Sequence, residues 1–244
     1  MTYFYGLMTA LWLCCVSFSA NGQESSNLQW HGYFSQGITQ SIDSDFITSD
    51  NQISAELTEI GLNGLYQVAS NISIAGQVVY LDGGNRFEQG SRLDYLFIDW
   101  TVDDIAGWQA QIHLGRYKNS HWLYSVTRDV PQTRDTAVLP QSVYFDGFRD
   151  VALGSNGIQT RFSKYTDNHV WEVNWSYGRS TINEEQRDYL LGSLALGKIK
   201  QDFVHQFSVF WQPASMNWKL GASWLDSDFE YIPLEQDNRF AGMS

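Results

Sequence analysis

Cysteine is almost absent from this 244-residue chain, whose two cysteines, Cys14 and Cys15, are adjacent and lie in an apolar N-terminal stretch. If that stretch is removed on export, the mature chain holds no thiol. Disulfides, thiolate catalysis and zinc-thiolate sites are then excluded. Charged residues are also scarce, at 17% of the chain, where soluble domains have about 25%.

Among the charged residues, the cationic ones are the less frequent. The chain has 15 Lys and Arg residues against 27 Asp and Glu residues, which gives a formal net charge of -12. An acidic chain without a basic face repels phosphate backbones, so we exclude nucleic acid as a partner. The five histidines lack metal-ligand spacing, and no complete calcium loop is present. We therefore expect no metal, no cofactor, no catalytic residues and no enzymatic activity.

Long hydrophobic runs are limited to one, from Leu7 to Phe18. It is shorter than the ~20 residues that a membrane-spanning helix needs, and small residues follow it. This is the pattern of an export signal, although the usual basic residues before the run are missing. We predict a signal peptide over residues 1–22, with cleavage after Ser19 or Gly22, and a mature domain over residues 23–244.

The mature region is rich in aromatic residues and alternates with a period of two, which is typical of β-strands. In "HVWEVNWSYG", for example, Trp171, Val173 and Trp175 fall on one face, and Glu172 and Asn174 fall on the other. The same alternation predicts nine strands near residues 28–40, 54–68, 71–82, 92–102, 108–116, 157–165, 169–179, 202–212 and 217–226.

Alternation alone also permits a soluble sandwich, but three further features favour a membrane barrel. The strands reach the nine or more residues of a tilted spanning strand. Aromatic residues gather near strand ends, where interfacial girdles lie. Short connections alternate with long ones, as periplasmic turns alternate with external loops. The predicted fold is an all-β, transmembrane, antiparallel up-and-down β-barrel in contact with outer-membrane lipid.

The number of predicted strands is odd, whereas single-chain bacterial barrels have an even number. The chain also ends in Ser244 rather than in an aromatic-terminated strand. We therefore expect an incomplete barrel, the N-terminal part of a larger one. Residues 189–200 are expected to lie in a long loop or its flank, and the stretch that begins with "DSDFE" at 226–230 in a loop or at the start of another strand pair.

Residues 117–156 form a connection too long for a turn, and Pro131 and Pro140 exclude one long helix or a central strand. Loops of this length are usually functional. If the segment folds into a barrel, its cations would face acids across a pore and set up a field that filters solutes. The available acids are Glu56, Glu59, Asp82, Asp94, Asp99, Asp103 and Asp104. The alternative is a solvated external loop held by ion pairs to Asp129, Asp135 and Asp150.

The stretch "LGRYKNSHWLYSVTRDVPQTRDTAVLPQSVYFDGFRDVALGSNGIQTRF" resembles the constriction-loop region, with its flanking strands, of porin-like outer-membrane proteins of Gram-negative proteobacteria. The likeness rests on G-R-x-K, T-R-D, P-Q-S-x-Y and R-D, at Gly115, Thr127, Pro140 and Arg149 onward. "NSHW" departs from the family's turn. The resemblance implies a porin, a water-filled channel for passive diffusion of small hydrophilic solutes or ions, either monomeric or homotrimeric.

The candidate pore-lining and constriction residues come from this segment and from the polar faces of the later strands. They are Arg116, Lys118, Arg128, Asp129, Arg134, Asp135, Arg149, Arg161, Glu172 and Lys219. Two other classes of function remain open. One is a secreted carbohydrate-binding β-sandwich that stacks exposed tryptophans on sugars, and the other is an outer-membrane enzyme.

Overall fold

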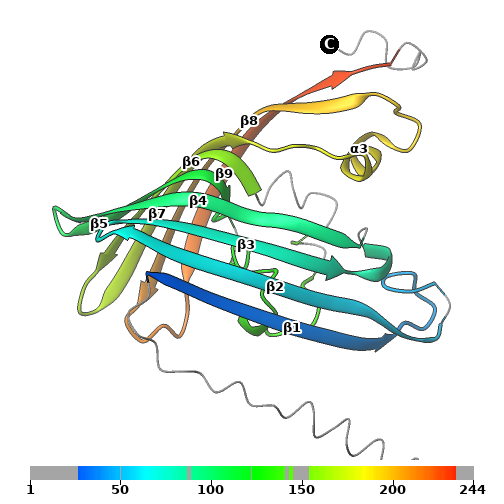
Figure 1. The fold of residues 1–244 in the computed structure, drawn as a ribbon, viewed down its shortest axis with the longest axis horizontal. Helices are drawn as coiled ribbons and strands as arrows, with labels where there is room; N and C mark the ends of the chain where they lie inside the picture. The colour runs from blue at the N-terminus through cyan, green and yellow to red at the C-terminus, as the bar shows by residue number, and fades with distance from the viewer. Residues whose placement is uncertain are drawn as a thin grey trace, which may run out of the picture.

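The computed structural model describes residues 27–49, 51–86, 89–121, 123–140, 143–144 and 154–234. In this part of the chain nine strands form one antiparallel sheet, and each strand pairs with its neighbours in the sequence. Figure 1 shows the sheet as a strongly curved layer with β1 at one edge and β9 at the other. These outer strands are not paired with each other, so the sheet is open.

The predicted all-β, up-and-down antiparallel architecture is confirmed, with one observed strand for each predicted segment. The strands are β1 (Leu28–Gln40), β2 (Ile53–Ala69), β3 (Ile72–Asp82), β4 (Gly90–Ile105), β5 (Trp108–Lys118), β6 (Gly154–Tyr165), β7 (His169–Arg179), β8 (Lys198–Pro213) and β9 (Leu220–Ile232). The expected signal peptide, residues 1–22, lies outside the described residues.

Two expectations near the C-terminal end of the sheet were wrong. Residues 198–200 belong to β8, and β9 continues to Ile232 through the "DSDFE" stretch, which is neither a loop nor the start of another strand pair. The reason lies in the pairing, because the acidic positions of β9 lie opposite β8. Asp226 is opposite His205, and Glu230 is opposite Lys200.

The β7–β8 connection contains a helix that was not predicted, α3 (Glu184–Leu191). A capping box begins it: the Asn183 side chain accepts from the backbone N–H of Gln186, and the Gln186 side chain accepts from that of Asn183. Two shorter 3-10 turns are η1 (Gly84–Arg86) and η2 (Pro131–Thr133). No helix among the described residues is long and apolar enough to cross a membrane.

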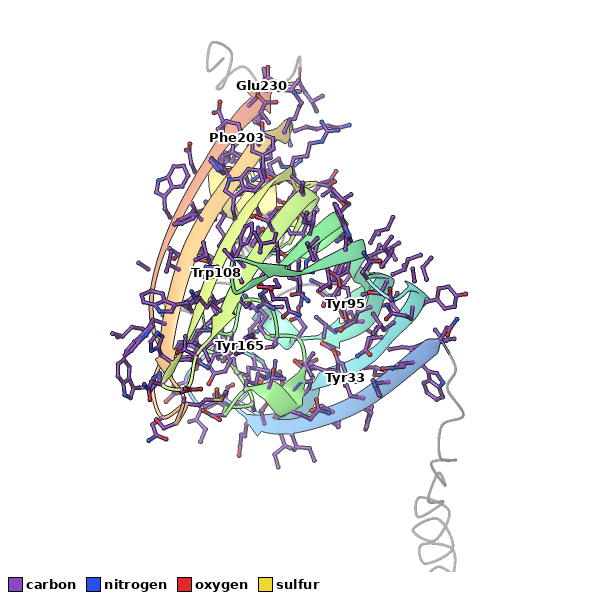
Figure 2. The ribbon with its side chains drawn as sticks, turned by 90° about the vertical axis from the view of Figure 1, so that its left-hand side faces the viewer. Tyr33, Tyr95, Trp108, Tyr165, Phe203 and Glu230 are labelled. Atoms are coloured by element: carbon purple, nitrogen blue, oxygen red, sulfur yellow. The ribbon has the colours of Figure 1, made fainter. Side chains whose placement is uncertain are left out.

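The two faces of the sheet have the reverse of the usual polarity of a soluble protein. Large apolar side chains stand exposed on the convex face: in β1 Trp30 is 67% exposed, Phe34 67% and Ile38 73%. Polar side chains are buried on the concave face, including Asn174, Ser176, Gln201, Gln206 and Ser208. In Figure 2 the strands curve around the segment that follows β5, which covers this polar face.

The strand register aligns the concave polar residues in rows. One row runs Asp99, His113, Gln159, Ser176 and Gln206 from β4 to β8. His113 lies 3.2 Å from Asp99 and 3.0 Å from Gln159, and Ser176 lies 3.3 Å from Gln206. Two of the four links in the row are therefore hydrogen bonds and a third is a His–Asp contact, which pairs most of these polar groups away from bulk water.

A second row on the concave face consists of glycines. Gly115, Gly157 and Gly178 lie opposite one another on β5, β6 and β7. Gly115 has a φ of 133°, which other residues rarely adopt. A Cβ added at Gly157 would lie 2.2 Å from the Tyr177 carbonyl oxygen. Glycine in a strand marks a tight bend or a close backbone approach, and both occur here.

Aromatic side chains form two clusters on the convex face. At the short-turn end, ring centroids lie 6.4 Å apart for Trp171 and Trp211, and 4.7 Å apart for Trp211 and Trp218. Toward the opposite end of the strands, the Phe203 ring stacks on the Tyr177 ring with their centroids 6.1 Å apart. The His205 ring lies edge-on to Tyr177 with a centroid distance of 6.0 Å. The convex face thus has a band of apolar side chains, aliphatic and aromatic, with an aromatic cluster near each end.

Candidate functional site

The candidate site is the concave polar face together with the segment over residues 119–140, here called the crossing segment. It begins at the end of β5, where the Ser120 carbonyl oxygen accepts bonds from Gln206 Nε2 and Ser208 Oγ of β8, both at 2.7 Å. The Asn119 amide donates to Ser155 Oγ at 3.1 Å, and Asn119 Oδ1 accepts from Ser176 Oγ at 3.3 Å. All of these groups are buried and uncharged, so neutral hydrogen bonds fix this end of the segment to β6, β7 and β8.

The other end of the crossing segment reaches β1 and β2. The Tyr33 hydroxyl of β1 donates to the Asp129 carbonyl oxygen, and the Arg134 guanidinium forms an ion pair with Glu59 of β2. Arg134 also donates to the Arg128 carbonyl oxygen at 2.7 Å. The segment therefore spans the concave face from the β8 side to the β1 side (Figure 2).

A buried charge cluster lies where the crossing segment meets β4 and β5. Lys118 Nζ lies 2.7 Å from Asp94 Oδ2 and 2.9 Å from Asp129 Oδ2, and all three side chains are 8% exposed or less. Gln159 Nε2 donates to the Lys118 carbonyl oxygen at 3.0 Å. A buried ion is costly unless it is paired, so each of these three groups needs the others.

Local bonds shape the crossing segment between its two ends. Pro131 begins the short turn η2, where a missing N–H costs nothing. The Thr133 hydroxyl is 2.8 Å from the carbonyl oxygens of both Thr127 and Val130. The Tyr124 hydroxyl donates to Asp135 at 3.3 Å, and the Asp135 carboxylate raises the pKa of Tyr124. The crossing segment thus has a compact conformation held by local hydrogen bonds rather than an extended one.

A second charge cluster lies on the concave face next to the β8 anchor. Arg161 Nη2 lies 3.3 Å from Glu172 Oε1, which also accepts from Asn174 Nδ2 at 3.0 Å. Asn174 in turn donates to Ser208, one of the two donors to Ser120. The Lys219 ammonium lies 4.3 Å from the centroid of the Phe210 ring, and Phe210 is the residue of β8 that lies opposite Glu172. The charged side chains of this cluster, Arg161, Glu172 and Lys219, are more exposed than those of the Lys118 cluster.

The structure gathers most of the predicted site residues into these groups. Lys118, Arg128, Asp129 and Arg134 belong to the crossing segment and its buried charges, with Arg128 only 4% exposed. Arg161, Glu172 and Lys219 form the second group. Asp135 is exposed and accepts a hydrogen bond from the Tyr124 hydroxyl.

Two predicted residues are placed elsewhere. Arg116 lies opposite Leu96 in the register and donates to the Leu93 carbonyl oxygen at 2.9 Å. It therefore shares the face of the exposed Leu96 and Leu114 rather than the concave face. Arg149 lies outside the described residues, as does Asp150.

The sequence indicated some of the partners and missed others. Glu59 and Asp94 were among the acids expected to oppose the cations, and both form ion pairs with them. Tyr33, Asn119 and Ser120 were not predicted. Tyr33 had a local signal, since it lies on the polar face of β1, but nothing local marks Ser120 because it acts through its carbonyl oxygen.

Comparison with protein-family models, with curated proteins and with solved structures found no match to this chain. Among the described residues, no group of three or more His, Cys, Asp or Glu side chains is placed to hold a metal ion. Any assignment of function therefore depends on the geometry of the sheet and the crossing segment.

Proposed function

We propose that this chain forms a porin-like wall of the outer membrane, with lipid on the convex face and a water-filled passage on the concave face. Small hydrophilic solutes or ions would diffuse through the passage, and the crossing segment would narrow it. The observation that carries the proposal is the reversed polarity of the sheet, with apolar side chains exposed outside and polar side chains buried inside.

The convex face has no evident function in water. Soluble monomers rarely expose contiguous apolar patches larger than a few hundred Å², yet exposed apolar residues recur on this face from β1 to β9. Trp30, Leu62, Leu96, Leu114 and Trp224 are each between 48% and 67% exposed. A face of this composition suits contact with lipid tails, since outer-membrane barrels alternate apolar residues outside with polar residues inside.

The spacing of the aromatic clusters fits a bilayer. Trp211 and Phe203 belong to opposite clusters and are separated by about 26 Å along β8 at ~3.3 Å per residue. Tilt shortens the component of that distance across the membrane. The apolar band of an outer-membrane barrel is about 25 Å tall and is bordered by aromatic girdles.

The crossing segment supports a role in filtering. Buried ion pairs hold it in place: Arg134 pairs with Glu59, and Asp129 pairs with Lys118 of β5, which also pairs with Asp94. The partly exposed charges of Arg161, Glu172 and Lys219 lie next to its β8 anchor. We assign the field that acts on a permeating ion to this second group.

The other two functions have less support. A carbohydrate-binding sandwich requires a second sheet, whereas the nine strands of the described ranges form one. For an enzyme, the closest arrangement to a catalytic pair is His113 with Asp99, but its further partner is the Gln159 amide, which is not a nucleophile.

The test uses the shortage of cysteine. In a background with Cys14 and Cys15 changed to Ser, single cysteines replace Gln111 on the concave face and Trp224 on the convex face. We expect a membrane-impermeant maleimide, applied to outer-membrane vesicles opened on both sides, to label Gln111→Cys at least tenfold faster than Trp224→Cys. Unfolding the protein in urea should remove the difference. Equal labelling in intact membranes, or recovery of the protein as a soluble periplasmic species, would overturn the proposal.

A further inference from the structure

A pocket at the end of β7, which shares Gln201 with the concave face, has a lining that indicates a specific ligand chemistry. Its volume is about 820 Å³, and its walls come from residues 179–184, Arg187, residues 196–201, Ile232 and Leu234. It thus lies between the residues on either side of α3, the first residues of β8 and the end of β9. Figure 1 shows α3 beside the first part of β8.

The lining collects positive charge in an otherwise acidic chain. Four cations line it, Arg179, Arg187, Lys198 and Lys200, against one acid, Glu184. The lining therefore has a formal net charge of +3, whereas the whole chain has -12. Such a concentration favours an anionic ligand over a neutral or cationic one.

Two of these cations are held in place by acids, and two are not. Arg187 lies 2.7 Å from Asp188 and donates to the Gly197 carbonyl oxygen at 3.1 Å. Lys200 lies 2.7 Å from Asp202 and 3.8 Å from Glu230. In the part of the chain that the structure describes, Arg179 and Lys198 form no ion pair. They are therefore available to a ligand.

The uncharged part of the lining combines the polar residues Ser180, Thr181, Asn183 and Gln201 with five aliphatic residues. Ile182, Leu196, Ile199, Ile232 and Leu234 all contribute to it, and Leu196, Ile232 and Leu234 are between 47% and 52% exposed. A hydrated inorganic anion would leave this surface in contact with water. An anion attached to an apolar chain would cover it, with a gain of about 25 cal/mol for each Å² removed from water.

We propose that this pocket binds a phosphate monoester that has an apolar tail, with the phosphate at Arg179 and Lys198 and the tail against the aliphatic residues. An arginine guanidinium matches two phosphate oxygens with its forked N–H groups, and a lysine ammonium adds a point charge. A dianionic head also suits a lining of net charge +3. The proposal does not depend on the sheet spanning a membrane.

The experiment is equilibrium dialysis of the full chain with radiolabelled octyl phosphate below its critical micelle concentration. We expect one site per chain, with octanol and inorganic phosphate each binding at least tenfold more weakly, because each has only half of the required chemistry. The Arg179→Ala/Lys198→Ala variant should lose at least tenfold in affinity. The charge-preserving variant Arg179→Lys/Lys198→Arg should recover most of that loss.

The matched control is Lys164→Ala/Lys219→Ala, which removes the same charge at the opposite end of the sheet and should leave octyl phosphate binding unchanged. Equal binding of inorganic phosphate, equal loss in the control, or unchanged binding in Arg179→Ala/Lys198→Ala would each overturn the proposal. Circular dichroism verifies that each variant keeps the sheet.

A second arm identifies the source of the phosphate. The chain is placed in phosphatidylcholine nanodiscs with or without phosphatidic acid, and octyl phosphate binding is measured again. Competition by phosphatidic acid assigns the site to a membrane lipid, whereas undiminished binding assigns it to a soluble phosphomonoester.

Discussion

The two ends of the crossing segment are fixed by different chemistry. At the β8 end, the Ser120 carbonyl oxygen and the Asn119 side chain take part in hydrogen bonds between uncharged groups. Toward the β1 end, Arg134 pairs with Glu59 of β2, and Asp129 pairs with Lys118 of β5. Neutral hydrogen bonds are modest in energy and insensitive to salt, whereas a buried ion pair is very costly to break on one side. The β8 end should therefore tolerate substitution, and the β1 end should not.

The largest expected effect is at Lys118. Lys118→Met leaves the buried Asp94 and Asp129 carboxylates facing each other without their cation. We expect the free energy of unfolding to fall by about 3–5 kcal/mol, as when one partner of a buried pair is removed. Urea titration of the detergent-solubilised chain measures it. Lys219→Met, which removes an exposed cation, is the control, and equal losses in the two variants would contradict the role of the cluster.

Breaking the Arg134–Glu59 pair should have the next largest effect. Glu59→Gln leaves a buried guanidinium with less than full compensation, so we expect a loss of about 2–4 kcal/mol and faster proteolysis within the crossing segment. The double variant Glu59→Gln/Arg134→Met should be more stable than Glu59→Gln alone, because the uncompensated charge is gone. Glu56→Gln, at an exposed site of the same strand, is the control. If the double variant is the less stable one, the pair is not coupled as described.

The neutral end should respond less. Ser208→Ala removes one of the two donors to the Ser120 carbonyl oxygen and leaves Gln206 in place. We expect a loss of about 0.5–1.5 kcal/mol, the same at low and high salt. Ser223→Ala, in the facing position on β9, controls for the change in strand composition. A loss as large as that of Lys118→Met would remove the distinction between the two ends.

The smallest effect concerns pH and lies next to the neutral anchor. Burial lowers the pKa of His121 below its ordinary value of 6.5, so the attached segment favours the neutral imidazole. The stabilisation contributed by the neutral His121 side chain is then complete above pH 6.5 and is lost as the pH falls through the lowered pKa. We expect proteolysis of the segment to accelerate at acidic pH, with a smaller change in His121→Gln. A pH dependence that is identical in the variant would place its origin elsewhere.

The sheet could be predicted because its information is local. A period of two with polar and apolar faces indicates each strand without knowledge of its partners. Where the local pattern fails, tertiary pairing decides: the acidic run in β9 resembles a loop, yet it pairs with Lys200 and His205 of β8. Helix α3 was missed because it lacks an apolar stripe, although its capping residues Asn183 and Gln186 stand in the sequence.

The site was less accessible to sequence reasoning. The identity of the cations and acids was apparent, but which of them meet depends on the path of the crossing segment through the concave face. Glu59 and Arg134 are 75 residues apart in the sequence, and no periodicity links them. The anchor at Ser120 involves a backbone carbonyl, which carries no residue-specific signal.

The glycines Gly157 and Gly178 have a consequence for how β6 and β7 align. The two lie opposite each other, and the backbones approach closely there. A slip by one residue would bring Asn156 or Ile158 of β6 to a position where even a Cβ meets the Tyr177 carbonyl oxygen of β7 at 2.2 Å. Misaligned pairings would therefore be rejected on steric grounds during assembly. The glycines thus select the native strand register by excluding the alternatives sterically.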